Sequence, residues 1–490
     1  MIPLTLREIA QVTGGRVHPD TPEAGAVVVT ATVVTDSREV VPGSLYVARR
    51  GDHADGHDFL DAAASRGAVA ALTNRESTVL PCVVVDEDPS RLSERPDRPP
   101  YDAVTRAFAA LAREVRDRCA AAGGLRTVAI TGSSGKTSTK DLMAQVLERL
   151  GPTLAPEASY NSEVGVPLTV CRLTEQHAYL VAEMGASGAG HIAHLTAIAP
   201  PTVSVVLNVG TAHLGEFGSR EAIGVAKSEI VEGLEPGGLA VLNADDPVVQ
   251  RMEHVAARVG ARILTVGRAQ DADVRASEVR LDGQGRASFR LHAADLEHDL
   301  RVSLRVVGEH HVGNALAVAA VAHEWGMPWV DVADALGRAE PRSPGRMQVT
   351  AREDGVTVVN DAYNANPDST AAALRALAAM RQTDGRVVAV LGGMLELGED
   401  SDAEHAGVGR LAAELGVDEL VAVGDLAEPA AAAYLGAGGA SARTVPDRHA
   451  ARAHLDQTLR GGDVVLLKSS RDSGLRLLGD ELAHASKDGD

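Results

Sequence analysis

Aromatic residues are scarce in this sequence, at 2% of all residues, with only two tryptophans and four phenylalanines. The hydrophobic core must therefore depend on Ala, Val and Leu, because too few large aromatic side chains are present to fill it. For the same reason, few side chains can stack on a flat ring of a ligand. Tyr160, Tyr179 and Tyr363 are among these candidates.

Cysteines and long hydrophobic runs are also few. The three cysteines, Cys82, Cys119 and Cys171, are odd in number and form no CxxC pair, which argues against a disulfide framework and against a zinc site. No run of about 18 apolar residues occurs, and the N-terminal segment MIPLTLREIA lacks a basic region followed by an apolar stretch. We therefore expect no membrane insertion and a cytoplasmic location.

Positive charge is in deficit, since 47 Lys and Arg against 67 Asp and Glu give a formal net charge of −20. This balance disfavours nucleic acids and anionic membranes as partners, because affinity for phosphate backbones needs clustered Lys and Arg. A small anionic ligand remains compatible with it, provided that a few cations, backbone N–H groups and a metal ion are concentrated locally. The sequence therefore directs attention to local sites.

Composition and length indicate several ordinary globular domains. The 490 residues are 45% hydrophobic and 23% charged, and this length predicts about three domains. A polar, Pro-rich stretch at residues 86–100 and the segment EPRSPGR at 340–346 are the candidate boundaries. We expect domains at residues 1–100, 101–340 and 341–490.

Short buried strands alternate with helices in each predicted domain. This alternation predicts an α/β fold with mainly parallel sheets: a small N-terminal α/β domain, a central phosphate-loop domain and a Rossmann-like C-terminal domain. Residues 287–293 and 300–307 instead alternate apolar and polar side chains. The predicted strands are 26–34, 44–48, 68–72, 127–130, 178–184, 202–209, 238–243, 287–293, 300–307, 356–363, 386–394, 419–424 and 463–470, and the predicted helices include 59–66, 102–122, a helix after Lys136, and 315–325.

A glycine-rich turn between a strand and a helix is the strongest local signal. The sequence TGSSGKTST at 131–139 follows the strand 127–130, although Ile130 stands where the longer GxxxxGK[ST] pattern has glycine. Glycines let backbone N–H groups approach a phosphate, Lys136 is suited to bridge β- and γ-phosphates, and Thr137 is suited to hold Mg²⁺. An ordinary Gly/Ser turn is the structural alternative. The predicted phosphate-binding residues are Gly132, Ser133, Ser134, Gly135, Lys136, Thr137 and Ser138.

Two further side chains follow neighbouring strands of the central domain. Glu183 ends the strand 178–184, and His213 follows the strand 202–209. Because the carboxyl ends of parallel strands meet at one edge of a sheet, we expect both beside the phosphate loop. Oxygen from Thr137 and Glu183 suits Mg²⁺, and His213 with Glu183 suits a second ion. Each residue taken alone is more often structural.

The motifs together resemble the Mur ligase family over nearly the whole chain. TGSSGKTS, the EMGA that begins at Glu183, NVGTAHLGEFGS and AKSEI match the central domain of that family. TDSREVVPGSLYVARRGDHADGHDF at 35–59 matches an N-terminal module that folylpolyglutamate synthetases lack. The resemblance implies that Lys227 is a carbamylated metal ligand, that Ser37 and Arg38 contact a nucleotide sugar, and that Asn161 contacts the muramyl group.

The third domain carries the motif that discriminates within the family. DAYNANPDS at 361–369 is similar to the branch that adds D-alanyl-D-alanine, and no DNPR, typical of ligases that add a diamino acid, is found. By this resemblance Asn314, Arg346, Asp361 and Tyr363 bind ATP, and Asn364 and Asn366 lie near the dipeptide. The chain departs from the family pattern at Ser162, His311 and Gly393.

The resemblance implies an enzyme of peptidoglycan synthesis. Its expected reaction is the ATP-dependent joining of D-alanyl-D-alanine to UDP-N-acetylmuramoyl-tripeptide through an acyl phosphate, with two Mg²⁺ ions and catalysis by Lys136, Glu183, His213 and Lys227. We expect a monomer with small-molecule substrates. The alternatives are a tripeptide-forming ligase that adds a diamino acid, and a non-catalytic nucleotide-binding relative.

Overall fold

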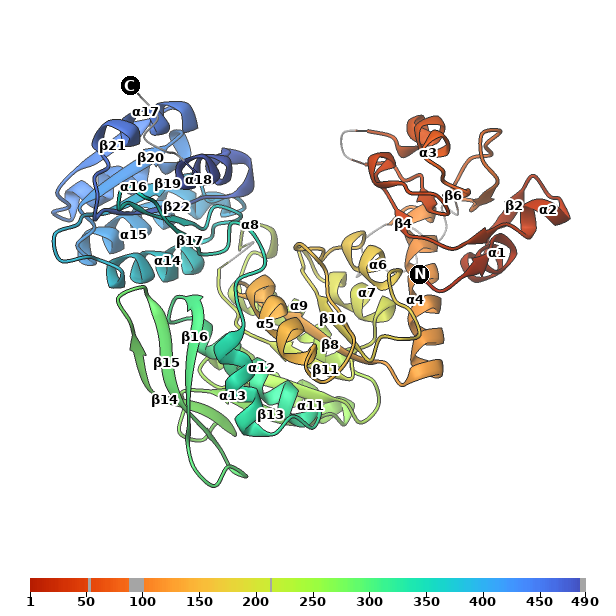
Figure 1. Cartoon of the computed structure of the whole chain (residues 1–490), viewed down its shortest axis with the longest axis horizontal. Coiled ribbons are helices and arrows are strands. Elements are labelled where there is room, and N and C mark those ends of the chain that lie inside the picture. Colours follow the sequence, from red (N-terminus) through yellow and green to blue (C-terminus); the bar gives the residue numbers. More distant parts are fainter. Residues whose placement is uncertain (52–53, 88–100, 212–213, 485–490) are drawn as a thin grey trace.

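The computed structural model describes residues 1–51, 54–87, 101–211 and 214–484. Three large sheets follow one another along the chain, and the N-terminal and C-terminal parts lie on different sides of the middle part (Figure 1). Most neighbouring strands in these sheets are parallel, so the predicted α/β fold with three parts is confirmed. None of the helices in the described ranges is long and apolar enough to cross a membrane.

The N-terminal part is a five-stranded sheet in the order β2-β7-β6-β5-β4, parallel except for the antiparallel pair β2–β7. A separate pair of short strands, β1 and β3, lies beside it. The strands are β1 (Leu4–Thr5), β2 (Arg16–His18), β3 (Val28–Val29), β4 (Val33–Val34), β5 (Leu45–Val47), β6 (Ala70–Thr73) and β7 (Cys82–Val84), and the helices are α1 (Leu6–Thr13), α2 (Pro22–Gly25), α3 (Leu60–Ser65), with 3₁₀ turns η1 (Ser37–Glu39) and η2 (Gly56–Phe59).

The long strand expected at 26–34 is wrong as a single element. Its first half pairs with β1 and its second half with β5, so the chain changes partners in between. Between the two halves, the N–H groups of Thr30 and Ala31 both donate to the carbonyl of Gly43 instead of to a neighbouring strand. β-branched residues favour extended backbone, but tertiary pairing decides how long each strand is.

The middle part is a nine-stranded sheet in the order β16-β15-β14-β13-β12-β11-β8-β10-β9. Strands β9 to β14 and β8 run parallel, whereas β14, β15 and β16 form antiparallel pairs, as their alternating pattern predicts. The strands are β8 (Arg126–Thr131), β9 (Thr153–Leu154), β10 (Tyr179–Glu183), β11 (Val203–Val206), β12 (Leu239–Asn243), β13 (Arg262–Gly267), β14 (Val274–Leu281), β15 (Arg286–Ala293) and β16 (Leu300–Val307).

Helices cover both faces of the middle sheet, because successive residues of each strand point to opposite faces. On one face, Val128 and Ile130 of β8 pack in a core with helices α5, α12 and α13. On the other, Ala129 packs in a core with α4, α6, α7, α9 and α11. The helices are α4 (Ala103–Gly123), α5 (Lys136–Leu147), α6 (Gly165–Val170), α7 (His191–Ile198), α8 (Leu214–Phe217), α9 (Arg220–Glu232), α10 (Pro247–Gln250), α11 (Glu253–Val259), α12 (His311–Glu324) and α13 (Trp329–Arg338).

The C-terminal part is a six-stranded sheet in the order β17-β18-β22-β19-β20-β21, parallel except for β17. Helices α14, α15 and α16 pack on one face, and α17 and α18 on the other. The elements are β17 (Gln348–Ala351), β18 (Thr357–Asn360), β19 (Val387–Leu391), β20 (Glu419–Val423), β21 (Ala442–Val445), β22 (Val464–Lys468), α14 (Pro367–Ala379), α15 (Ser401–Glu414), α16 (Glu428–Gly436), α17 (Arg448–Thr458) and α18 (Leu475–Ala483).

The packing of α15 against α16 generates a prediction. A Cβ atom at Gly409 in α15 would lie 2.0 Å from the carbonyl oxygen of Ala430 in α16, whereas a Cβ at Gly436 would meet no atom within 4 Å. We expect Gly409→Ala to lower the free energy of unfolding by about 1–3 kcal/mol through overpacking. Gly436→Ala is the matched control and should be neutral or slightly stabilising. Urea denaturation of both variants checks this, and equal stabilities would contradict it.

Candidate active site

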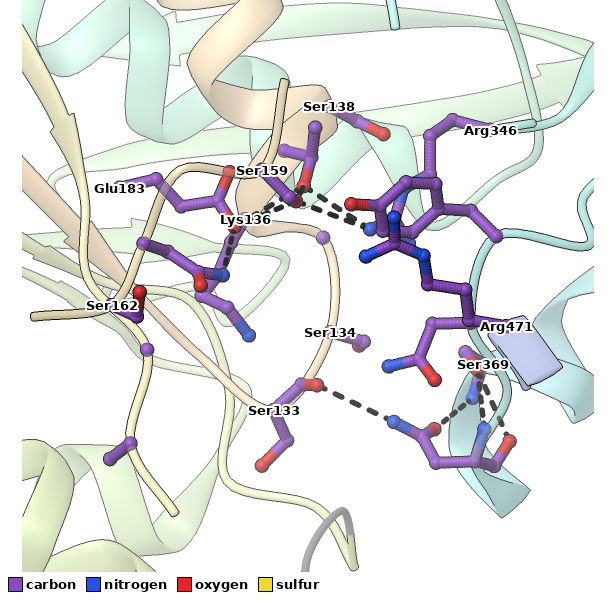
Figure 2. A pocket seen from close by; sticks show the side chains of 18 of the residues that line it. Ser133, Ser134, Lys136, Ser138, Ser159, Ser162, Glu183, Arg346, Ser369 and Arg471 are labelled. Carbon is purple, nitrogen blue, oxygen red and sulfur yellow. Dashed lines mark hydrogen bonds between the residues drawn. The ribbon is translucent and has the colours of Figure 1, made fainter. Parts of the chain in front are cut away.

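A cavity of about 440 Å³ lies between the middle and C-terminal parts. Its wall is formed by the phosphate loop, the segment 159–163, the end of β10, α9, and residues around 346–369 and 468–471 (Figure 2). The lining includes five Lys or Arg residues and three Asp or Glu residues, so a chain of strongly negative net charge has a local positive excess here. Such an excess favours a polyanionic ligand. The five cations are Lys136, Lys227, Arg346, Lys468 and Arg471, and the three acids are Glu163, Glu183 and Asp361.

The phosphate loop joins the end of β8 to the start of α5, as the sequence predicts. Gly135 precedes the helix in the left-handed region, with φ of +82°, and a Cβ there would lie 2.9 Å from Oδ1 of Asn314, so only glycine fits without strain. The ammonium of Lys136 donates to the carbonyl of Gly132 at 2.7 Å, which holds it across the loop. Backbone N–H groups at the first turn of α5 are left for an anion.

Asn208, just after β11, holds the loop in shape. Its Oδ1 accepts from the N–H of Ser134 at 2.9 Å, and its carbonyl accepts from the N–H of Ser133 at 3.0 Å. Its Nδ2 returns a hydrogen bond to the carbonyl of Ser134 at 3.2 Å. Strand β11 neighbours β8 in register, with Val206 opposite Thr131, which is why this side chain reaches the loop. The loop is therefore organised before any ligand binds.

Glu183, at the end of β10, is the acceptor on which several segments converge. Its Oε1 accepts from Asn161 Nδ2 at 2.8 Å, from Ser159 Oγ at 3.2 Å and from Thr137 Oγ1 at 3.2 Å. The residue is 1% exposed, and its second oxygen, Oε2, is buried without a hydrogen-bond partner. Since buried carboxylate oxygens are normally paired, Oε2 is suited to a cation or donor from a ligand.

Arg346 joins the two parts at the cavity. Its guanidinium donates from Nη2 to Thr137 Oγ1 and to Ser159 Oγ, both at 3.4 Å, and lies over the ring of Tyr363 at 4.3 Å (Figure 2). Its Nε is buried without a partner. The guanidinium therefore keeps hydrogen-bonding capacity for an anion while the aromatic face fixes its plane.

Two lysines in the cavity have depressed pKa values. Burial lowers the pKa of Lys136, and Arg346 lowers it further, whereas Glu183 raises it. Burial lowers the pKa of Lys227 in α9 well below its usual value, and the charge of Lys136 adds to the effect. The Lys227 side chain is 4% exposed, and no hydrogen bond or ion pair is found for it within the described ranges. An amine in this environment is favoured as the neutral base, which is a nucleophile.

The C-terminal part contributes a second set of polar groups. Lys468 Nζ donates to Asp361 Oδ2 at 2.6 Å and to the carbonyl of Asn364 at 2.8 Å. Asn366 caps α14 through the N–H of Ser369 at 2.8 Å, and its Nδ2 reaches the carbonyl of Ser133 at 3.4 Å. Asn366 is therefore both the cap of α14 and a contact of the phosphate loop.

The structure brings most of the predicted site residues together. Gly132 belongs to the phosphate loop and Asn314 lies against Gly135, but neither lines the cavity. Ser37 and Arg38 lie in the N-terminal part and do not line it either. Ser37 is buried, whereas Arg38 is mostly exposed and paired with Asp36. His213 lies outside the described residues. The predicted residues that line the cavity are Ser133, Ser134, Gly135, Lys136, Thr137, Ser138, Asn161, Glu183, Lys227, Arg346, Asp361, Tyr363, Asn364 and Asn366.

The three departures from the family pattern have local structural roles. Ser162 lines the cavity, and its Oγ accepts from two N–H groups at the start of α6. His311 is buried and shares a hydrogen bond of 3.1 Å with Asn314. A Cβ at Gly393 would lie 3.0 Å from Leu426, so an aspartate there requires Leu426 to move.

The sequence patterns assign no role to several residues of the site, among them Ser159, Asn208, Lys468 and Arg471. Ser159 bonds Thr137, Glu183 and Arg346, yet a lone serine in a loop carries no signal apart from its position two residues before Asn161. Asn208 was noticed only as the start of a matching motif. Asn208 holds the phosphate loop because β11 lies next to β8. The sequence alone does not give this order of strands.

Fold and cavity together define a phosphate-loop protein of three α/β parts, with a polyanion site between the second and the third. The family models agree: residues 10–116 match the Mur ligase family, catalytic domain, residues 130–322 the Mur ligase middle domain, and residues 345–471 the Mur ligase, glutamate ligase domain. The chain belongs to the Mur ligase family.

Individual relatives are similar over the whole length. UDP-N-acetylmuramoyl-tripeptide--D-alanyl-D-alanine ligase of Mycobacterium tuberculosis is 46% identical, with 98% of each chain covered. The crystal structure of MurF from Acinetobacter baumannii superposes with a TM-score of 0.84 at 31% identity, with 99% of each chain covered. MurF ligase from Thermotoga maritima, solved in complex with ADP, gives a TM-score of 0.74 at 29% identity, covering 93% of this chain and 97% of that one.

The buried imidazole of His311 generates a pH prediction. Burial lowers the pKa of His311 well below its usual value of about 6.5, and His310 adds to this. Below about pH 6.5 the unfolded chain therefore binds a proton that the folded chain does not, and stability falls as the pH falls, by up to ~1.4 kcal/mol per pH unit. His311→Asn should reduce this loss. Urea unfolding at pH 7.5 and 5.5 measures it, and an equal loss in both proteins would contradict the prediction.

Proposed function

We propose that this chain is an ATP-dependent ligase that joins D-alanyl-D-alanine to UDP-N-acetylmuramoyl-tripeptide. The observation that carries the proposal is the cavity itself, in which the phosphate loop, the carboxylate of Glu183 and the guanidinium of Arg346 face the DAYNANPDS segment of the C-terminal part. Relatives named for this reaction are similar to the chain from end to end. The DAYNANPDS segment, which distinguishes this branch of the family, thus lines the same cavity as the phosphate loop.

The reaction proceeds in two steps. An oxygen of the tripeptide's terminal carboxylate bonds to the γ-phosphorus of ATP as the bond to the β-phosphate oxygen breaks, giving an acyl phosphate and ADP. The amine of D-alanyl-D-alanine then attacks the acyl carbon, phosphate leaves, and a proton is lost from nitrogen. Lys136 and Arg346 neutralise the charge on the transferred phosphoryl group, and catalysis is mostly positioning and electrostatics.

Mg²⁺ fits the residues that surround Glu183. The unpartnered Oε2 of Glu183 and the hydroxyl of Thr137 are hard oxygen ligands, which Mg²⁺ prefers. We assign one ion to these two groups, and a second to Glu183, His213 and Lys227. When bound, the ions withdraw charge from the phosphoryl and carboxylate oxygens. The hydrogen bonds of Ser159 and Asn161 go to Oε1 and leave Oε2 free for the ion.

Lys227 is proposed to be a carbamate. Its neutral nitrogen attacks the carbon of CO₂, forms an N–C bond and releases a proton, and this leaves an anionic oxygen ligand. The buried side chain, its depressed pKa and the nearby Lys136 all disfavour an ammonium at this position. A carbamate reverses the sign of the charge and makes Lys227 compatible with two neighbouring cations.

The remaining predicted contacts place the three substrates on three parts of the chain. Ser37 and Arg38 hold the UDP end, Asn161 the muramyl group, and Asn364 and Asn366 the dipeptide. Asn314, Asp361 and Tyr363 complete the ATP site. We further propose domains at 1–100, 101–340 and 341–490 and a monomeric state. We also propose a cytoplasmic location, because all three substrates are water-soluble small molecules.

An acceptor panel tests the reaction. With ATP, Mg²⁺ and UDP-N-acetylmuramoyl-tripeptide, phosphate release should require D-alanyl-D-alanine, and neither meso-diaminopimelate nor lysine should replace it. Lys136→Ala should reduce turnover by at least about 10³-fold, since it removes a transition-state charge contact. Turnover at the same rate without the dipeptide would contradict the proposal. Activity with a diamino acid instead would favour the tripeptide-forming ligase, and a lack of any turnover the non-catalytic relative.

Carbamylation of Lys227 is tested separately. After incubation with ¹³C-bicarbonate, the wild-type protein should show a carbamate carbon resonance that Lys227→Met lacks. We expect Lys227→Met to lose activity about 10²-fold or more, and acetate or propionate should restore part of it in Lys227→Ala by supplying the missing oxygen ligand. A wild-type spectrum without the resonance, together with full activity of Lys227→Met, would contradict the assignment.

A further inference from the structure

A buried ion pair lies behind the phosphate loop, outside the cavity. Lys140 and Asp141, in the second turn of α5, are 2% and 5% exposed, and the Lys140 ammonium contacts Oδ1 of Asp141. Neither residue lines the cavity. Burying two charges costs several kcal/mol per ion, and well-packed apolar residues are often at least as stabilising, so such a pair is weak evidence for stability alone. Its contacts indicate another role.

The ammonium of Lys140 ties together separate segments of the chain. Besides Asp141, it donates to the carbonyl of Pro156 at 2.9 Å and to Oγ of Ser343 at 3.3 Å. Asp141 in turn accepts, through Oδ2, from the N–H of Ser343 at 2.9 Å. The pair therefore joins helix α5, the loop after β9 and the linker that leads into the C-terminal part.

The same three segments meet again at the active site. Helix α5 carries Thr137, the loop after β9 carries Ser159, and the linker carries Arg346. There the hydroxyls of Thr137 and Ser159 lie 2.6 Å apart, and Arg346 reaches both at 3.4 Å. The contacts of Lys140 and Asp141 thus hold three segments together at one point. A few residues further along each segment, Thr137, Ser159 and Arg346 form the wall around Glu183 (Figure 2).

The linker is docked along one face of α5. Asp141, Gln145 and Glu148 are spaced by four and three residues and therefore share a helix face. Gln145 bonds the carbonyl and the N–H of Glu340, at 2.8 and 3.0 Å, and Glu148 pairs with Arg342. The linker leaves this face only after Ser343, where left-handed residues follow, Gly345 with φ of +68° and Met347 with φ of +46°.

We propose that Lys140 and Asp141 are positioning residues for the use of ATP, which hold the linker so that Arg346 lies at the phosphate loop. The inference rests on the proposed function. An arginine side chain has many conformers, and a fixed backbone origin reduces the entropy lost when it binds an anion. With the linker anchored at Ser343, the backbone of Arg346 starts three residues from a point that two buried hydrogen bonds hold in place.

The test combines ATP binding with a double-mutant cycle. Lys140→Met and Asp141→Asn should each weaken equilibrium ATP binding and raise the KM for ATP by about three- to tenfold. A loss of this size corresponds to the net free energy of about one hydrogen bond. In an Arg346→Ala background, Lys140→Met should have little further effect, because the side chain that it positions is absent. Arg342→Ala, which removes the exposed linker pair with Glu148, is the matched control and should leave ATP binding unchanged.

The outcomes separate this inference from the proposed function. Losses of ATP affinity that are equal in the wild-type and Arg346→Ala backgrounds would overturn the positioning role, whatever the ligase assay shows. Equal losses from Arg342→Ala would overturn it as well. If Lys140→Met melts at a much lower temperature than the wild type, the double-mutant cycle is carried out with Asp141→Asn, which keeps the side-chain volume. Failure to use D-alanyl-D-alanine, with the cycle as expected, would instead contradict the proposed function alone.

Discussion

The whole site depends on one buried carboxylate. Glu183 collects hydrogen bonds from Thr137, Ser159 and Asn161, and its remaining oxygen is buried without a hydrogen-bond partner. Burying a carboxylate that is 1% exposed costs free energy, and such donors offset that cost. Thr137 belongs to the phosphate loop, and Ser159 and Asn161 belong to the segment 159–163, so the carboxylate also fixes the relative positions of these two segments. Removing it would leave several donors unpaired.

Sheet order is what gathers these groups. Strands β10, β8 and β11 are neighbours, and their carboxyl ends carry Glu183, the phosphate loop and Asn208. The crossover helices return the chain to the other edge each time, so functional side chains collect at one end and structural ones at the other. Asn208 organises the loop while Gly135 admits Asn314 beside it. Much of the pocket therefore lies on the middle part, and the C-terminal side adds Arg346, the DAYNANPDS segment, Lys468 and Arg471.

The sequence predicts whatever a short stretch of chain determines. The phosphate loop and the parallel strands follow from local sequence pattern. The motif resemblance adds Arg346 and Tyr363 to the candidate site residues. Ser159 and Lys140 could not be found this way, because their roles arise from contacts between residues far apart in sequence. The split of the strand at 26–34 has the same origin, since propensity shows that backbone is extended but not which strand it pairs with. Long-range partners are the information that pattern lacks.

The charges in the cavity also explain how the C-terminal part is held. Hydrogen bonds that cross between the parts, such as Asn366 to Ser133 and Thr211 to Asp368, are each worth only about 0.5–1.5 kcal/mol. Lys136 and Arg346 meanwhile repel each other when no anion separates them. A triphosphate reverses the sign of that interaction, and it does so across the boundary, because Arg346 belongs to the linker and Lys136 to the loop. A bound triphosphate therefore adds an attraction between the two parts that the hydrogen bonds of their contact surface do not supply, and the linker anchored at Ser343 holds Arg346 beside the phosphate loop.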